Sequence, residues 1–196
     1  MKNKTLGIIG LGYVGLPLAI EFSKFFKTIG FDLNSKRVKD LNDGIDSTNE
    51  ANLGDLKAQL SNNLLIVDNL EKIRNCNIFI ITVPTPITKF KTPDLSYLIS
   101  ASKSIGSILK KGDIVIYEST VYPGCTEEEC VPVLEKSSGL IFNKDFFCGY
   151  SPERINPGDK INTLTKIKKV TSGSTLEIAK VIDDIYGSII TAGTHL

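Results

Sequence analysis

The sequence predicts an α/β fold in which helices cover both faces of a doubly wound, mostly parallel β-sheet. Short apolar segments of strand length alternate along the 196 residues with segments of helical periodicity, the order typical of such sheets. The strand candidates are apolar throughout, as expected for strands buried on both faces. A glycine-rich run at residues 6–15 has the form of a tight turn between a first strand and a first helix.

Each element follows from its local pattern. The first strand is expected at 6–10 and the first helix at 14–26, where apolar residues recur with helical spacing. The other strands are expected at 28–32, 64–67, 78–83, 114–118 and 146–150, with 169–172 as a further candidate. The other helices are expected at 35–43, 53–62, 95–109, 126–136 and 175–185. Asp94 is a candidate cap for the helix at 95–109, and Ser174 and Thr175, with Glu177, for the last helix.

The run Leu6-Gly-Ile-Ile-Gly10-Leu-Gly12-Tyr-Val-Gly15 has the spacing of a dinucleotide-binding turn. Gly10 permits the tight turn, Gly12 lets the backbone approach a pyrophosphate, and Gly15 lets the helix pack closely on the sheet. Asp32, 22 residues after Gly10, is placed to accept hydrogen bonds from the ribose hydroxyls of NAD. Because a 2′-phosphate would meet this carboxylate, the sequence predicts a Rossmann-like domain that binds NAD and not NADP. The alternative is a glycine-rich turn without a ligand.

Composition and charge argue against several functional classes. The net charge of +1 gives no electrostatic case for binding nucleic acid or a membrane surface. No apolar run approaches the ~20 residues that span a bilayer, and the N-terminus lacks signal-peptide features, so the cytoplasm is the expected location. The cysteines (Cys76, Cys125, Cys130 and Cys148) form no Cys-x-x-Cys pair and the only histidine is His195, so no metal site is predicted.

Two further motifs follow strand candidates, at the sheet edge where doubly wound folds bind ligands. They are Thr-Val-Pro-Thr-Pro at 82–86 and Glu-Ser-Thr-Val-Tyr-Pro-Gly at 118–124. The hydroxyls of Thr85, Ser119 and Thr120 are candidates to bond a cofactor or a substrate. The alternative is that these residues only end strands and form turns.

The longest irregular stretch, 149–165, contains Ser-Pro-Glu-Arg-Ile-Asn-Pro-Gly-Asp at 151–159. Its Glu153, Arg154 and Asn156 suit acid–base work and the binding of a phosphate or a sugar. The alternative is a solvated loop with an internal contact between the glutamate and the arginine. The lysines that follow are expected to form a solvated surface; they are Lys166, Lys168 and Lys169.

These motifs together resemble those of the UDP-glucose/GDP-mannose dehydrogenase family, the nucleotide-sugar 6-dehydrogenases. The resemblance covers essentially the whole chain, with motifs in the same order at 10–17, 82–86, 118–124 and 151–159. The forms Thr-Val-Tyr-Pro-Gly-Cys-Thr-Glu-Glu and Ser-Pro-Glu-Arg-Ile-Asn-Pro-Gly-Asp are most similar to the branch that acts on UDP-N-acetylhexosamines. That branch supplies uronic acids for capsular and Vi-type surface polysaccharides.

The resemblance implies a four-electron oxidation of the sugar C6 alcohol to a carboxylate. NAD takes a hydride, a cysteine captures the aldehyde as a thiohemiacetal, and a second NAD oxidises this to a thioester that water hydrolyses. In the family, the nucleophilic cysteine lies beyond the cofactor domain, with a linking helix and a second α/β domain that binds the UDP-sugar. This chain stops at Leu196, so residues 1–196 are expected to be one NAD-binding domain, inactive alone.

The resemblance also implies roles for individual residues. The residues implied for the cofactor are Gly10, Gly12, Tyr13, Val14, Gly15, Asp32, Arg37, Val83, Thr85, Ser119 and Thr120. Among them, Arg37 corresponds to a residue over the adenine–ribose end, and Thr120 also to the threonine that orders a catalytic water. Glu153 corresponds to the glutamate of the acid–base steps, and Glu153, Arg154 and Asn156 are the candidates for substrate contacts.

Several alternatives stay open from the sequence. One is a UDP-glucose 6-dehydrogenase, and another is a stand-alone NAD-binding module without catalysis. A 2-hydroxyacid or hydroxyacyl dehydrogenase is a third, against which the segments 118–124 and 151–159 argue. The resemblance implies a homodimeric parent enzyme that dimerises through the linking helix. This chain alone is compatible with a monomer, with apolar surface exposed where that helix would lie.

Overall fold

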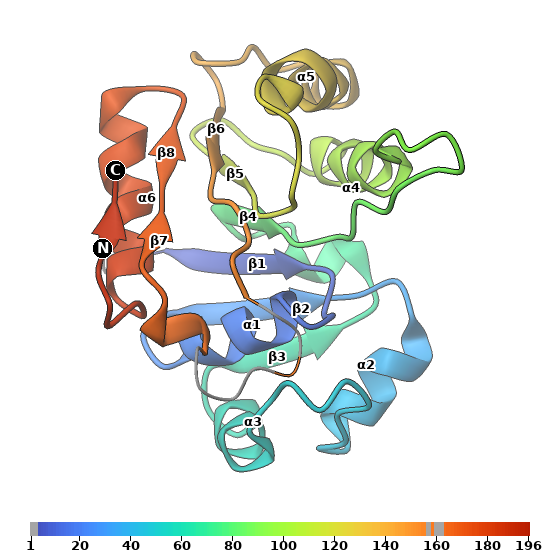
Figure 1. The fold of residues 1–196 in the computed structure, drawn as a ribbon, viewed down its shortest axis with the longest axis vertical. Coiled ribbons are helices and arrows are strands. Elements are labelled where there is room, and N and C mark those ends of the chain that lie inside the picture. The colour runs from blue at the N-terminus through green and yellow to red at the C-terminus, as the bar shows by residue number, and fades with distance from the viewer. Residues whose placement is uncertain (1–3, 156–157, 159–162) are drawn as a thin grey trace.

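The computed structural model describes residues 4–155, 158 and 163–196. Within them, seven strands form a sheet in the order β3-β2-β1-β4-β5-β6-β8 (Figure 1). Neighbouring strands from β3 to β6 are parallel, whereas β8 is antiparallel to β6. The strands are β1 Thr5–Ile9, β2 Lys27–Phe31, β3 Leu64–Val67, β4 Ile78–Ile81, β5 Ile114–Tyr117, β6 Phe147–Tyr150 and β8 Ser172–Gly173. The predicted doubly wound sheet is confirmed, and its order reverses between β1 and β4.

Helices cover both faces of this sheet. Among the described residues they are α1 Gly15–Ser23, α2 Ser35–Asn42, α3 Leu53–Leu60, α4 Ser96–Gly106, α5 Val131–Ser138 and α6 Leu176–Gly187. Helices α1 and α6 pack on one face, and α4 and α5 on the other (Figure 1). The 3₁₀ turns η1 (Leu70–Ile73) and η3 (Leu164–Lys166) are short elements that the pattern does not predict.

Successive residues of the central strands belong to opposite hydrophobic clusters. In β4, Ile78 and Ile80 pack with residues of α1, whereas Phe79 and Ile81 pack with residues of α4. The residues of β5 divide in the same way. Since both faces are buried, each position needs an apolar side chain, which explains the continuous apolar runs.

Two expected elements are divided in the structure. The strand expected at 169–172 is two short strands, because β7 (Lys169–Val170) pairs with β9 (Thr194–His195) in a separate sheet and β8 joins the main one. The helix expected at 126–136 is a π-helical turn, η2 (Thr126–Cys130), followed by α5. Pro132 lies in the first turn of α5 and has no N–H to donate to the carbonyl four residues earlier, which accounts for the division.

Thr175 is the N-cap of α6 as expected, whereas the N-cap of α4 is Leu95, which makes no side-chain cap bond, and Asp94 lies one residue before it. Thr175 Oγ1 accepts the N–H of Ile178 at 3.2 Å, and Asp94 Oδ1 accepts the N–H of Ser96 at 2.9 Å. These bonds satisfy backbone donors that have no partner within the helix.

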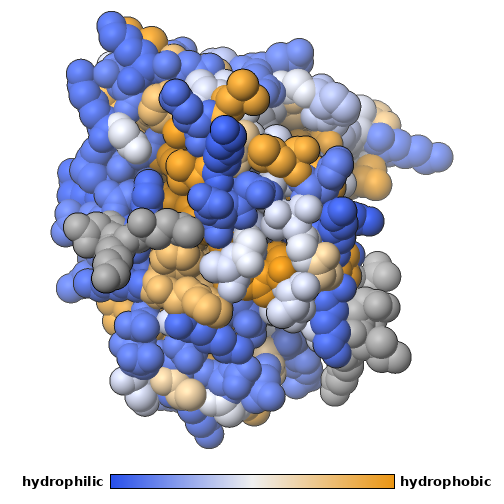
Figure 2. Space-filling view, turned by 90° about the vertical axis from the view of Figure 1, so that its left-hand side faces the viewer, coloured by the Kyte–Doolittle hydropathy of each residue, from blue (hydrophilic) through white to orange (hydrophobic). Residues whose placement is uncertain are grey.

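Figure 2 shows the side of the molecule that carries α6 and the C-terminal end in Figure 1. Apolar areas interrupt a mainly hydrophilic surface on this side. The exposed apolar residues include Leu176 at the start of α6 and Leu196 at the chain end. Across the described ranges, no helix combines the length and apolar character that crossing a bilayer requires.

Candidate functional site

The carboxyl ends of the parallel strands border one cavity of about 510 Å³. Of the residues that the sequence predicts for the site, those that line this cavity are Gly10, Gly12, Tyr13, Val14, Asp32, Val83, Thr85, Ser119, Thr120 and Glu153. Gly15 packs beneath the glycine turn, Arg37 lies behind it, and Arg154 is exposed on the loop after β6. Asn156 lies outside the described residues. The tertiary structure therefore brings five separate segments of the chain to one place.

The glycine turn between β1 and α1 has different requirements at its three glycines. Gly10 has a φ of +91°, a conformation that L side chains rarely adopt. A Cβ on Gly15 would overlap the carbonyl oxygen of Gly10 and the hydroxyl of Thr82, whereas a Cβ on Gly12 would meet nothing within 4 Å. The protein itself thus requires glycine at 10 and 15. The space beside Gly12 is open to the cavity.

Asp32 follows β2 and faces this turn. Its Oδ2 accepts the N–H of Leu11 at 2.8 Å, and its Oδ1 accepts the N–H of Asn34 at 2.9 Å. Each carboxylate oxygen can accept more than one hydrogen bond, so the half-buried group can still receive ligand hydroxyls. The backbone holds the carboxylate at the cavity in advance of any ligand.

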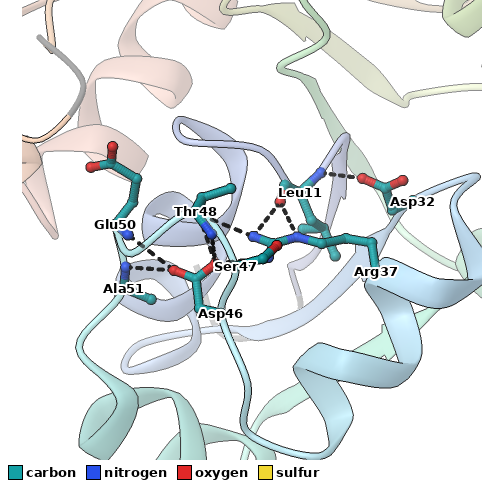
Figure 3. Close-up of polar contacts among 8 residues, drawn as sticks. All are labelled: Leu11, Asp32, Arg37, Asp46, Ser47, Thr48, Glu50 and Ala51. Carbon is teal, nitrogen blue, oxygen red and sulfur yellow. Dashed lines mark hydrogen bonds and ion pairs between the residues drawn. The ribbon is translucent and has the colours of Figure 1, made fainter.

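Arg37, near the start of α2, is buried behind the glycine turn (Figure 3). Its Nε and one terminal nitrogen donate to the carbonyl oxygen of Leu11 at 3.1 and 3.0 Å. Its remaining N–H groups donate to Asp46 at 2.7 Å and to the hydroxyls of Ser47 and Thr48 at 3.2 Å. All five donors of the guanidinium are therefore used within the protein, and they join the glycine turn to the segment after α2.

Asp46 is the buried partner of Arg37, and sequence reasoning missed it. Its carboxylate also accepts the N–H and hydroxyl of Thr48 and the N–H groups of Glu50 and Ala51 (Figure 3). Burial by itself would raise the pKa of Asp46, but the hydrogen bonds from Thr48, Ala51 and Arg37 outweigh it and lower the pKa to about 2. The turn-forming sequence Asp-Ser-Thr at 46–48 could have predicted the hydrogen bonds from the backbone to Asp46. It does not predict that Arg37 is the partner of this carboxylate.

This depressed pKa predicts a specific acid sensitivity. Since the pKa of Asp46 is about 2 in the folded chain and near 3.8 in the unfolded chain, its ionised form contributes about 2 kcal/mol above pH ~4. That contribution is lost as the pH falls from about 4 towards 2, because the unfolded chain takes up a proton on Asp46 in this range before the folded chain does. Urea unfolding at pH 5 and pH 2.5 checks this: Asp46→Asn should show a smaller drop in the free energy of unfolding than the unmodified chain. Equal drops would contradict the assignment.

Hydroxyl groups form hydrogen bonds between the segments that follow β4 and β5. Ser119 Oγ donates to the carbonyl oxygen of Val83 at 2.5 Å, and Thr85 Oγ1 donates to that of Thr120 at 2.7 Å. Both side chains therefore support the turns while they line the cavity. At these positions a role in forming the turn is therefore compatible with a role in binding a ligand.

Glu153 lies three residues after β6 and lines the same cavity. Its Oε1 accepts the backbone N–H groups of Arg154 and Ile155, whereas its Oε2 is buried with no hydrogen-bond partner among the described residues. The Arg154 guanidinium instead donates to the carbonyl oxygen of Lys168 at 3.1 Å. A buried carboxylate oxygen without a partner is costly in a purely structural role, so it indicates a place for an external proton donor.

Lys169 is buried, and the expectation that it belongs to a solvated surface is wrong. Its ammonium forms an ion pair with Glu118 at the end of β5, and Tyr186 of α6 donates its hydroxyl to the other Glu118 oxygen. Burial raises the pKa of Glu118, the ammonium of Lys169 opposes this, and the charge of Glu153 adds to the rise. A carboxylate at the end of an apolar strand signals a buried cation, but the pattern does not tell which lysine supplies it.

A second cavity of about 270 Å³ adjoins the first and shares Gly10, Asp32, Val83 and Pro84 with it. Its other lining residues, which sequence reasoning did not identify, are Ile9, Phe31, Leu33, Asn34, Tyr97, Ser100, Ala101, Ser104 and Ile105. The cavity is mainly apolar. It offers a flat aromatic group a place beside Asp32.

The four cysteines are free and buried. Burial raises the pKa of Cys76 and of Cys130 to about 12, and raises that of Cys148 well above its ordinary range. These side chains are thiols at neutral pH. None of them lines the cavity.

Comparison with known protein families matches residues 4–190 to the NAD-binding domain of the UDP-glucose/GDP-mannose dehydrogenase family. The chain is 61% identical over 195 residues to a UDP-N-acetyl-D-glucosamine 6-dehydrogenase of Pseudomonas aeruginosa, covering 100% of this chain and 46% of the relative. It is 57% identical over 190 residues to the Salmonella typhi protein of the same name, covering 97% of this chain and 44% of that one.

The fold of this chain is also found in a solved structure of the same family. The structure of a UDP-D-ManNAc dehydrogenase from Pyrococcus horikoshii superposes with a TM-score of 0.91 at 33% identity, covering 98% of this chain and 46% of that one. The chain thus spans about half the length of the relatives that it matches.

Proposed function

The chain belongs to the UDP-glucose/GDP-mannose dehydrogenase family, and from this we propose that it is the NAD-binding part of a UDP-N-acetylhexosamine 6-dehydrogenase. The complete enzyme would oxidise the C6 alcohol of the sugar to a carboxylate with two NAD, for surface polysaccharides made from cytoplasmic precursors. The observation that carries the proposal is the convergence of all four family motifs on one cavity at the switch point of the sheet.

The residues present fit NAD. The open space beside Gly12 allows close approach of a pyrophosphate, and the first N–H groups of α1 favour negative charge there. The carboxylate of Asp32 lies between the main cavity and the apolar one, where it would accept the hydroxyls of the adenosine ribose. The adenine would then occupy the apolar cavity, and Arg37 would hold the glycine turn from behind instead of contacting the base directly. When bound, NAD supplies the hydride acceptor of the reaction.

The opposite end of the cavity carries the groups proposed for the reaction. Val83, Thr85 and Ser119 lie where the strands β4 and β5 end, beside the proposed place of the nicotinamide. The unpartnered oxygen of Glu153 would hold or move the proton of a water or of the sugar alcohol. Thr120, which lines the same cavity, would orient that water.

The nucleophile is proposed to lie outside this chain. The four cysteines are buried thiols away from the cavity, so none is placed to capture an aldehyde. Most of the UDP-sugar pocket and the dimer contacts of the complete enzyme are likewise proposed to lie in the other half. The purified chain alone should therefore bind NAD without turning over.

A chimeric enzyme tests this proposal. Residues 1–196 replace the matching part of the Pseudomonas aeruginosa relative, and NADH formation is followed with NAD or NADP and with UDP-N-acetylglucosamine or UDP-glucose. We expect two NADH per molecule of UDP-N-acetylglucosamine and at least about tenfold discrimination against NADP, which corresponds to only about 1.4 kcal/mol. An Asp32→Ala chimera should lose most of that discrimination. A folded chimera that binds NAD but oxidises neither sugar would contradict the proposal.

A further inference from the structure

A buried ion pair contacts the chain at Pro152, the residue before Glu153, and its Glu118 member lines the same cavity. The side chains of Glu118 and Lys169 are 0% and 3% exposed. The ammonium of Lys169 contacts one oxygen of Glu118, donates to the carbonyl oxygen of Pro152 at 3.1 Å, and lies 5.8 Å from the ring centroid of Tyr186. The hydroxyl of Tyr186 occupies the other Glu118 oxygen. Every polar atom of this cluster therefore has a defined partner.

The cluster acts on the chain at the residue before Glu153. Ser151 is already tied down, since its N–H donates to Tyr117 and its hydroxyl to the carbonyl of Val170 at 2.7 Å. The contact of Lys169 with Pro152 extends this attachment by one residue. Beyond it, Glu153 bonds only to the backbone N–H groups of its own loop among the described residues. The bond from the Lys169 ammonium to Pro152 is thus the last contact with another part of the fold before Glu153, which carries the unpartnered oxygen.

Stability alone is a weak reason for such a pair. Removing two charges from water is costly, and a well-packed apolar pair of similar volume commonly stabilises a fold equally well. An ammonium does something that an apolar side chain cannot, because it donates to a carboxylate and to a carbonyl oxygen at the same time. The bond to Pro152 is the one that connects the pair with the cavity.

We propose that Lys169 is a positioning residue: held by Glu118, its ammonium fixes the Pro152 carbonyl and so directs the Glu153 carboxylate into the cavity. The proposal rests on the function proposed above, in which Glu153 handles a proton. It assigns a role to Glu118 as well, since that carboxylate keeps the ammonium in place. Neither residue touches the reacting atoms in this scheme.

Amide hydrogen exchange of this chain, measured by NMR, tests the positioning directly. Lys169→Met alone would leave the buried carboxylate of Glu118 without its counter-charge. The main variant is therefore Glu118→Gln combined with Lys169→Met, which removes both charges and keeps the side-chain volumes similar. We expect the amides of Arg154 and Ile155 to exchange at least about tenfold faster in this variant, while those of β1 are unchanged. Lys169→Arg, which keeps the donors, should behave as the unmodified chain.

The matched control is Tyr186→Phe, which disturbs the same cluster but leaves the bond from Lys169 to Pro152. It should lower the melting temperature without changing exchange at Arg154 and Ile155. Unchanged exchange in the double variant, or an equal acceleration in Tyr186→Phe, would overturn the proposal. Should the double variant fail to fold, Glu118→Gln combined with Lys169→Gln replaces it, since this pair leaves no unpaired charge and the glutamine side chain is too short to contact residue 118 and Pro152 together.

The chimeric enzyme separates this proposal from the proposed function. The double variant should lose at least about tenfold in kcat with KM for NAD unchanged, and Lys169→Arg should recover most of the rate. A purely structural pair would lower the melting temperature and leave kcat of the folded enzyme unaltered, which would overturn the positioning role. If the unmodified chimera makes no NADH while exchange responds as expected, the function fails and the positioning stands.

Discussion

Replacing Gly15 by alanine is expected to destabilise the chain by roughly 3 kcal/mol, whereas Gly12→Ala should change its stability by less than about 0.5 kcal/mol. The reason is the different surroundings of the two glycines. A Cβ on Gly15 would overlap the Gly10 carbonyl oxygen and the Thr82 hydroxyl, so the turn and α1 would have to move apart. A Cβ on Gly12 would point into space that the protein leaves open.

The affinity for NAD should fall in Gly12→Ala, the variant whose stability is expected to be nearly unchanged. The methyl group of Gly12→Ala would occupy the approach of the pyrophosphate, so we expect a folded chain whose affinity for NAD falls at least about tenfold, or about 1.4 kcal/mol. Urea unfolding gives the stabilities and calorimetric titration the affinities. Gly12→Ala with unaltered affinity would show that the pyrophosphate does not lie against this turn. Gly15→Ala with unaltered stability would show that the turn is looser than the structure indicates.

Replacing Arg37 by methionine is expected to cost about 3–5 kcal/mol in the free energy of unfolding. The change leaves the carboxylate of Asp46, which is wholly buried, without its cation, and it leaves the carbonyl oxygen of Leu11 without two donors. Since Leu11 belongs to the glycine turn, the affinity for NAD should fall in the same variant. Urea unfolding and calorimetry on the same samples measure both effects.

The chain offers a matched control for this prediction. Arg74 and Glu71 form an ion pair of the same 2.7 Å length as Arg37 and Asp46, but their side chains are 51% and 62% exposed. Arg74→Met should therefore leave the unfolding midpoint unchanged, because solvent screens an exposed pair. Adding Asp46→Asn to Arg37→Met should recover a substantial part of the lost stability. Equal losses in Arg37→Met and Arg74→Met would contradict the buried network.

Much of the site could be predicted because its parts follow strands that the sequence marks clearly. Val83, Thr85, Ser119 and Thr120 lie at one edge as expected, since parallel strands bring their carboxyl ends to the same side of a sheet. The apolar cavity beside Asp32 was not predicted, because α4 forms much of it and the packing angle of that helix has no local signature. The division of the helix expected at 126–136 was also missed, although Pro132 marks its position.

The sequence by itself determined that the sheet is doubly wound and mostly parallel. It also determined where the glycine turn and the acidic residue after β2 lie, because these features depend on patterns of residues close along the chain. Only the tertiary structure decided which charges are buried together. Lys169 pairs with Glu118 across 51 residues, and the Arg37 side chain reaches the carbonyl oxygen of Leu11 across 26. No local pattern distinguishes Lys169 from the exposed Lys168 beside it. The choice follows from the free energy of burial, since a charge withdrawn from water must find its counter-charge wherever the folded chain places one.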